Sequence, residues 1–346
     1  MEAGLENASH VFASCGVDIG GTFTDCVLMD AGGHAYSGKS ATTRDDLTRG
    51  FFDAIEVAAD KAGYTLLDAL AGLPYLAHGT TVATNIMVER NGAQVALITT
   101  CGHGDVTFIQ RAAGRVAGLP MAQLLDLHLG VKPPPLVPRS LVFEVDERID
   151  FEGDVVVPLD EEAVRDAVRT ALDRGAVAFC VAFLWSFRNP DHERRAKELI
   201  AELAPAAFVS ASHEVAPSWG EYERTMSAVI NSHVGPDTAT YIGRLEHELA
   251  DRGFTGLFSV MKSSGGVASD GEARQFPVKL LSSGPAGALA GSQYLLEAMG
   301  SQTGNAITTD MGGTSFDIGL IVDGRPQTAD ESVVGRFEFH LPTIDI

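Results

Sequence analysis

Basic residues are scarce in this chain. Its 346 residues include 25 lysines and arginines against 46 aspartates and glutamates, which gives a net charge of −21 and a pI of about 4.7. No basic stripe offsets this charge, so the composition opposes binding to nucleic acid or to an anionic membrane. Any phosphate-binding pocket must therefore depend on backbone amides and a metal ion.

Long apolar runs and paired cysteines are also missing. The most apolar stretch, residues 176–184, is far shorter than the roughly 20 residues that cross a bilayer, so it predicts a buried strand. Residues 1–7 lack the basic and apolar regions of a secretion signal. The cysteines have no paired spacing, which predicts reduced thiols in the core: Cys15, Cys26, Cys101 and Cys180. We expect a cytoplasmic protein.

One pattern occurs twice, near the two ends of the chain. Residues 18–25 read Asp-Ile-Gly-Gly-Thr-Phe-Thr-Asp, and residues 310–317 read Asp-Met-Gly-Gly-Thr-Ser-Phe-Asp. Each copy is flanked by apolar residues, so each predicts a strand, a tight turn that contains the glycines, and a second strand. Two copies in the same register favour a shared role over two unrelated turns.

The residue types of these turns suit a phosphate and a metal ion. Glycines can adopt positive φ and have no Cβ, so backbone amides can converge on an anion. The threonine and serine hydroxyls add donors. Asp18 and Asp310 need a cation beside a phosphate, and Mg²⁺ prefers one or two carboxylates together with phosphate oxygens. The predicted phosphate-binding residues are Gly20, Gly21, Thr22, Gly312, Gly313, Thr314 and Ser315. The alternative is a pair of ordinary Gly-Gly hairpin turns.

Two further segments lie where helices are expected to begin. Residues 78–81, His-Gly-Thr-Thr, follow a strand, so their free amides can hold an anionic or carbonyl oxygen. The alternative is a helix cap with a hydrogen-bonded core histidine. Gly284 precedes Pro285, which we expect at the first position of a helix whose amides point at the same cleft. Close helix packing explains Gly284 equally well.

One motif match is rejected. Residues 33–40 fit the P-loop pattern G-x-x-x-x-G-K-[ST], which requires a helix that starts at Lys39. Helical periodicity resumes only at Leu47, and residues 30–33 indicate a hairpin turn. We therefore expect Lys39 on a strand.

Strands and helices alternate along the rest of the chain, which predicts a mixed α/β protein. Buried strands are expected near residues 95–99, 177–183 and 257–261, and helices near 47–58, 160–172, 219–233 and 237–252. Within the third of these helices, Glu221 and Arg224 are three residues apart, and an ordinary surface ion pair explains them.

The repeated hairpins resemble those of the sugar kinase, Hsp70 and actin superfamily, in which two such turns clamp ATP and Mg²⁺. Four further segments, in this order, resemble the hydantoinase A and 5-oxoprolinase family. They are His78-Gly79-Thr80-Thr81-Val82-Ala83-Thr84-Asn85, Glu221-Tyr222-Glu223-Arg224, Ser263-Ser264-Gly265-Gly266 and Ser283-Gly284-Pro285-Ala286-Gly287. The resemblance implies an actin-like ATPase fold with mixed sheets, flanking helices and an incomplete second lobe.

The resemblance also implies a reaction. Family members are thought to transfer the γ-phosphate of ATP to the oxygen of a cyclic amide, of hydantoin or 5-oxoproline type, before ring opening. Asp18, Asp310, His78 and Thr80 would then be catalytic, with Asp18 and Asp310 as the Mg²⁺ ligands. A hydantoinase B-like partner subunit or a missing C-terminal half would complete the enzyme. Alternatives are the ATP-binding subunit of a ketone carboxylase and a non-catalytic actin-like fragment.

Family chains continue well beyond the length of this one, so we expect a truncated or split protein. The predicted organisation is a disordered tail at 1–13, an N-terminal domain at 14–205, and the start of a core domain at 206–346. The strands after the second hairpin would leave an unfinished sheet that exposes Ile318, Leu320 and Val322. Residues 102–115 depart from the oxoprolinase-type sequence, which leaves the substrate open between amide and ketone.

Overall fold

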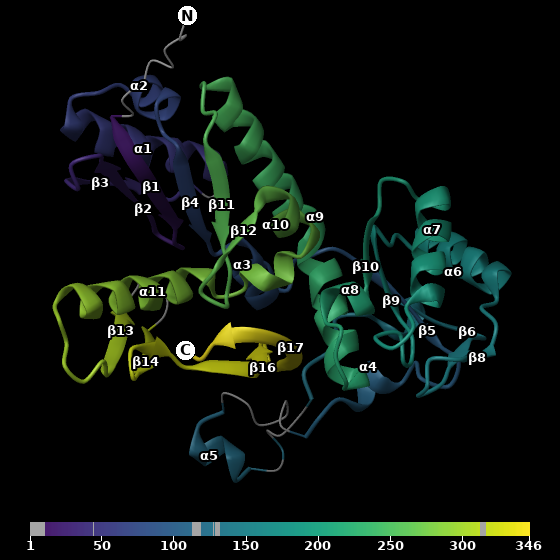
Figure 1. Cartoon of the computed structure of the whole chain (residues 1–346). Helices are drawn as coiled ribbons and strands as arrows, with labels where there is room; N and C mark the ends of the chain where they lie inside the picture. The colour runs from purple at the N-terminus through teal and green to yellow at the C-terminus, as the bar shows by residue number, and fades with distance from the viewer. Residues whose placement is uncertain (1–10, 44, 113–118, 127, 129–131, 312–315) are drawn as a thin grey trace, which may run out of the picture.

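The computed structural model describes residues 11–43, 45–112, 119–126, 128, 132–311 and 316–346. Within these residues the strands form one six-stranded, one four-stranded, one three-stranded and two two-stranded sheets, with helices packed against them (Figure 1). The predicted mixed α/β class is confirmed. The first strand begins at Phe12, inside the expected tail at 1–13, and residues 1–10 lie outside the described part.

The six-stranded sheet carries the first hairpin. β1 pairs antiparallel with β2 and parallel with β4, and α1 (Leu47–Ala62) covers one face of the sheet. Asp46 caps α1 through the Thr48 amide, and Phe51, Ile55 and Ala58 form its buried stripe. In spatial order the strands are β12 (Val267–Ser269), β11 (Leu257–Met261), β4 (Tyr75–Thr80), β1 (Phe12–Ile19), β2 (Phe23–Asp30) and β3 (Ala35–Ala41). This sheet joins strands from both sides of the predicted boundary at 205/206.

The four-stranded sheet is parallel and forms the core of the teal lobe in Figure 1. Its central strands are continuous apolar runs because α9 and the pair α6 and α7 supply helical cover. The strand order is β10 (Phe208–Ala211), β9 (Ala178–Ala182), β5 (Val95–Thr100) and β6 (Val142–Val145), and the helices are α6 (Glu161–Asp173) and α7 (Asp191–Leu203).

Helix α9 (Glu221–Asp251) connects these sheets. We predicted two helices here, but one helix of 31 residues runs through Pro236. Proline removes one backbone hydrogen bond, which ordinarily breaks a helix. Residues 222–235 are buried without interruption, and this packing on neighbouring elements maintains the helix across the proline.

The second hairpin lies at the yellow end of the chain in Figure 1, against α11. A three-stranded antiparallel sheet is followed by a separate two-stranded ribbon that packs on α9. The elements are α11 (Ser283–Ala298), β13 (Ala306–Met311), β14 (Phe316–Val322), β15 (Arg325–Pro326), β16 (Thr328–Val334) and β17 (Phe337–Ile344). Pro285 is the third residue of α11 rather than the first, because the helix starts at Ser283.

The remaining elements are short. They are α2 (Leu66–Ala71), α3 (Val82–Glu89), α4 (Val106–Ile109), α5 (Met121–Leu124), α8 (Ser212–Val215), α10 (Asp270–Gln275), β7 (Arg148–Ile149), β8 (Val155–Val157) and 3₁₀ turns at Arg139–Leu141 and Pro277–Leu280. Among the described residues, no helix combines the length and apolarity needed to span a bilayer.

The expected surface ion pair between Glu221 and Arg224 is wrong. Arg224 is buried, and its guanidinium donates to Ser212 Oγ and to the carbonyl of Phe183, 2.9 Å away. The cysteine prediction is partly wrong, because Cys101 is exposed while the other three cysteines are buried. Arg224 is buried against Phe183, which follows β9, and Cys101 follows β5. Local residue spacing carries no information about where these strand ends lie.

The rejected P-loop lies on β3, as expected. Lys39 is a strand residue, and its ammonium contacts Asp25 Oδ1 at 2.7 Å on an exposed surface. No helix begins at this lysine, so its ammonium is not positioned by the loop geometry that a P-loop needs.

We predict that Lys39→Ala changes the affinity for MgATP by less than about fivefold, since an exposed ion pair contributes at most about 1 kcal/mol. Isothermal titration of the assembled protein measures this. Lys61→Ala is the matched control, because Lys61 also contacts β3, through the Ser37 carbonyl. Abolished binding in a folded Lys39→Ala variant would restore the P-loop interpretation.

Candidate functional site

The first hairpin has the predicted geometry. Asp18 lies directly opposite Asp25 across β1 and β2, and the Gly20 amide donates to the Phe23 carbonyl at 3.0 Å to close the turn. Gly20 and Gly21 lie between the strands but do not adopt positive φ, so that part of the prediction is wrong. The turn remains an exposed backbone loop, with the Thr22 side chain at the surface.

Thr42 holds this turn in place, and no local sequence pattern predicts that role. Its hydroxyl donates to the Gly20 carbonyl at 2.8 Å, and its amide donates to the Thr22 carbonyl at 2.9 Å. Thr42 follows β3 directly, so the third strand fixes the conformation of the turn between the first two. These two bonds occupy carbonyl oxygens of the turn, and such a turn presents its amides to the other side.

The second hairpin repeats the register of the first. Asp310 lies opposite Asp317, and Met311 lies opposite Phe316. The predicted turn residues Gly312, Gly313, Thr314 and Ser315 lie outside the described residues. The strands on either side of them therefore confirm the strand–turn–strand pattern without describing the turn itself.

The carboxylate of Asp18 lies against two glycines. A Cβ added at Gly79 would be 2.4 Å from Asp18 Oδ1, and a Cβ at Gly284 would be 3.5 Å from the same oxygen. Gly79 is the penultimate residue of β4 and Gly284 is the second residue of α11, so three chain segments meet at this carboxylate. Residue 79 must be glycine for Asp18 to keep its position.

Asp18 and Asp310 share one electrostatic environment. The pKa of Asp18 is raised above its ordinary value, mainly by burial and then by the charges of Asp25 and Asp310. Asp18 is nonetheless exposed to solvent, so this desolvation reflects the protein atoms packed near the carboxylate and not an enclosed side chain. Within the described chain, no hydrogen bond or ion pair satisfies this carboxylate. Of the three carboxylates in this cluster, Asp25 is paired with Lys39 and Asp18 is not, and such a cluster suits a divalent cation.

Short polar contacts join β4 and the first turn of α3 to the start of α11. Ser283 Oγ donates to the Thr80 carbonyl at 3.0 Å, and the Ser282 amide donates to Thr84 Oγ1 at 2.9 Å. Ser282 has φ of 59°, a left-handed conformation that is uncommon for serine. These contacts keep Gly284 beside Asp18.

His78 and Thr80 do not open into the site. His78 is completely buried, with Nδ1 3.1 Å from the Val17 carbonyl and Nε2 2.9 Å from the hydroxyl of Tyr241. Thr80 is also fully buried, and its hydroxyl accepts from the Val82 amide. Both side chains satisfy the alternative considered from the sequence, a core histidine and a helix cap. They position the strands around Asp18.

A pocket of about 240 Å³ lies beside Asp310. Helix α11 forms one wall through Pro285, Ala288 and Ser292, and the β13–β14 hairpin forms the other through Asp310 and Asp317. Its volume suits a small ligand or part of a larger one, and its two carboxylates again favour a ligand that brings a cation.

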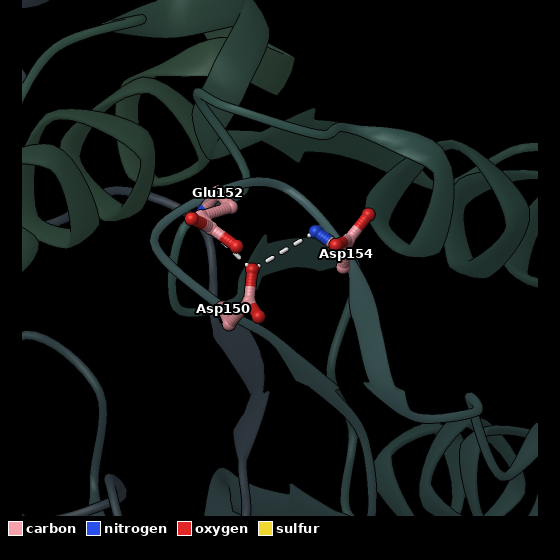
Figure 2. A group of neighbouring side chains, drawn as sticks. All are labelled: Asp150, Glu152 and Asp154. Carbon is pink, nitrogen blue, oxygen red and sulfur yellow. Dashed lines mark hydrogen bonds between the residues drawn. The ribbon is translucent and has the colours of Figure 1, made fainter.

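A second group of carboxylates lies away from the hairpins. Figure 2 shows Asp150, Glu152 and Asp154 in the turn between β7 and β8, with acidic oxygens within 4.8 Å of one another. One oxygen of Asp150 accepts the amides of residues 152, 153 and 154 at 2.9–3.0 Å. The turn itself therefore explains the position of Asp150, and we assign no metal to this group.

We predict that Gly79→Ala displaces the Asp18 carboxylate and lowers the affinity for MgATP at least tenfold while the protein stays folded. The added Cβ would lie at less than van der Waals distance from the Asp18 oxygen. Gly16→Ala on the same strand as Asp18 is the control, because a Cβ there meets nothing within 4 Å. Equal affinity in the two variants would show that the position of Asp18 is irrelevant to the nucleotide.

We predict that His78 makes stability depend on pH. Burial lowers its pKa to about 4 from 6.5. Between these values the unfolded state binds a proton that the folded state does not, so stability falls as the pH drops. The free energy of unfolding at pH 4 is therefore about 3 kcal/mol lower than at pH 7. Urea unfolding from pH 7 to pH 4 should show this loss in the wild type and not in His78→Gln. Parallel pH profiles for the two proteins would contradict the assignment.

Comparison with known proteins identifies the family. The model of the hydantoinase/oxoprolinase N-terminal region matches residues 14–204, and the hydantoinase/oxoprolinase model matches residues 224–346. The acetophenone carboxylase gamma subunit of Aromatoleum aromaticum is 38% identical over 96% of this chain and 44% of its own length.

Two solved structures share the fold. One is a nucleotide-free structure of acetone carboxylase, whose description refers to ATP-dependent acetone carboxylation. It superposes with a TM-score of 0.89 at 30% identity, over 96% of this chain and 47% of that chain. The ATP-dependent caprolactamase from Pseudomonas jessenii gives 0.82 at 34% identity, with the same coverage. These neighbours and the paired hairpins agree with the expected actin-like ATPase type of fold. The chain spans less than half the length of the relatives it matches. It belongs to the hydantoinase/oxoprolinase family.

Proposed function

We propose that this chain supplies the nucleotide-binding half of an ATP-dependent enzyme that phosphorylates the carbonyl oxygen of a cyclic amide, of hydantoin or 5-oxoproline type. The observation that carries the proposal is the unsatisfied Asp18 carboxylate, set between Gly79 and Gly284 and within electrostatic reach of Asp310. Relatives described as ATP-dependent or as oxoprolinases support the reaction class.

The residues present fit MgATP. Asp18 and Asp310 offer the hard oxygen ligands that Mg²⁺ prefers. Gly79 and Gly284, which have no side chains, lie beside the Asp18 carboxylate. Turn residues Gly21 and Thr22 offer backbone amides for phosphate oxygens, while the Gly20 amide closes the turn, and Gly284 adds the start of helix α11. When bound, MgATP would supply the phosphoryl group that turns the amide oxygen into a leaving group.

The chain contributes position and charge rather than a nucleophile. Asp18 and Asp310 would hold the cation, while Thr42 keeps the first turn in shape. His78 donates one ring nitrogen to the Val17 carbonyl and accepts from Tyr241, which fixes the strand end before Asp18. Such preorganised contacts are the main source of rate in phosphoryl transfer. We therefore assign His78 and Thr80 to positioning, and not to contact with substrate.

A second candidate function is the ATP-binding role in a ketone carboxylase. The 38% identity to a subunit of acetophenone carboxylase and the close superposition on acetone carboxylase favour it. A ketone would be phosphorylated on its enol oxygen by the same arrangement. Phosphate release from ATP with 5-oxoproline, hydantoin or caprolactam, compared with acetone or acetophenone plus bicarbonate, distinguishes the two functions.

We further propose that the active enzyme includes a hydantoinase B-like partner subunit and the polypeptide that corresponds to the second half of the relatives. Relatives named as subunits support this assembly. All four cysteines are free thiols, although Cys15 Sγ and Cys26 Sγ lie 3.6 Å apart, and free thiols suit the reducing cytoplasm, where we place the protein.

We predict that Asp310→Ala lowers Mg²⁺-dependent turnover of ATP at least a hundredfold in the assembled enzyme, because one cation ligand is lost. Steady-state phosphate release with and without substrate measures the effect. Asp330→Ala is the control, since Asp330 is an exposed carboxylate on β16 away from the hairpins. Turnover within threefold of the wild type in Asp310→Ala would remove Asp310 from the site.

A further inference from the structure

The two hairpins differ in how their sheets are covered. In the first, α1 packs on β2 and β3, and the face of the sheet that carries Val17, Ile19, Cys26 and Leu28 is buried. Asp18 and Asp25 lie on the opposite face, because successive strand residues alternate. The first copy of the repeat is therefore a sheet with one face buried under a helix and an exposed face that carries Asp18 and Asp25 together with Phe23, Val27 and Met29.

In the part of the chain that the structure describes, no helix covers the apolar face of the second copy. Across β13 and β14, Ile307 lies opposite Leu320 and Met311 lies opposite Phe316, so these side chains share one face with Ile318. All five are between 44% and 80% exposed, and Val322, on the same face of β14, is 42% exposed. An antiparallel sheet with a solvated face ordinarily carries polar residues there.

Helix α11 covers the other face of the same sheet. A Cβ at Gly319 would be 2.1 Å from a methyl carbon of Leu289, which shows how closely α11 lies against β14, and Ile321 is buried on this side. Asp310 and Asp317 belong to this face, where they line the pocket with α11. The apolar face therefore lies directly behind the residues that face the site.

We propose that the exposed face of β13 and β14 is the binding surface for an amphipathic helix equivalent to α1. The polypeptide that corresponds to the second half of the relatives supplies this helix. The repeat specifies the occupant, because Ile318 and Leu320 stand where Cys26 and Leu28 stand in the first copy, and those residues are buried in the sheet that α1 covers. The length of the relatives supplies the source, since this chain matches under half of each.

This helix-binding surface extends the proposed function, and it rests on that function only for the role of Asp310. A helix on the outer face would fix β13 and β14 between two layers, and with them the position of Asp310. Packing of this kind excludes water from six large apolar side chains, a patch that isolated proteins seldom leave open. Binding itself requires no nucleotide.

The test uses the purified chain and, as the probe, the part of the acetophenone carboxylase gamma subunit that lies beyond the aligned half. Sedimentation velocity without ATP should show a one-to-one complex, and hydrogen exchange should slow in β13 and β14. Ile318→Glu should weaken the complex at least tenfold. Leu67→Glu is the matched control, an exposed leucine on α2 at 57% exposure, and should bind like the wild type.

Leu320→Glu provides a second variant, and thermal unfolding of each variant alone verifies that the fold is intact. Three results would overturn the proposal: no complex with the wild type, equal binding by Ile318→Glu and Leu67→Glu, or a wild-type dimer that Ile318→Glu dissociates, which would assign the face to a second copy. Because no nucleotide is present, loss of ATP-dependent chemistry would leave this result unchanged. The experiment therefore distinguishes an error in the proposed function from an error in the proposed helix-binding surface.

Discussion

The carboxylate of Asp18 can occupy its place only because residue 79 has no Cβ, whereas a Cβ at residue 284 would lie at ordinary contact distance, 3.5 Å. One oxygen lies 2.4 Å from the position that a Cβ on Gly79 would take. This close approach requires that the ends of β1 and β4 stay in register and that α11 begin beside them. The hydrogen bonds of Thr42, His78 and Ser283 each hold one of these three segments. Packing therefore determines where the Asp18 carboxylate lies, and electrostatics then determines what it can bind.

Helix α9 extends this constraint through the molecule. Tyr241 reaches the His78 ring near Asp18, Ser227 accepts from the His340 amide on β17, and Arg224 donates to the carbonyl after β9. One rigid element thus contacts the sheet of the first hairpin, the ribbon that follows the second hairpin, and the parallel sheet. The sheet of Asp310 is joined to the sheet of Asp18 by helix α11, which contacts β4 and β11 on one side and β13, β14 and β15 on the other.

The sequence predicted the parts of the site that depend on local pattern. Alternation and paired glycines located both hairpins, and the missing helix after Lys39 was enough to reject a P-loop. The parts that depend on tertiary packing were not accessible. Burial of His78 needs Tyr241 from a distant helix, and the path of α9 through Pro236 needs neighbours on all sides. Gly79 was visible as part of a motif, but its reason is the side chain of a residue 61 positions earlier, which periodicity cannot reveal.

The central claim is that Asp18 and Asp310 hold one cation together with one nucleotide. A double-mutant cycle on MgATP binding, with Asp18→Asn, Asp310→Asn and the double variant in the assembled enzyme, tests it most directly. If both carboxylates ligate the same ion, each single change removes most of the Mg²⁺-dependent affinity, and the double variant loses little more than either one. Losses that add in free energy would show that the two aspartates act independently, and would contradict the account.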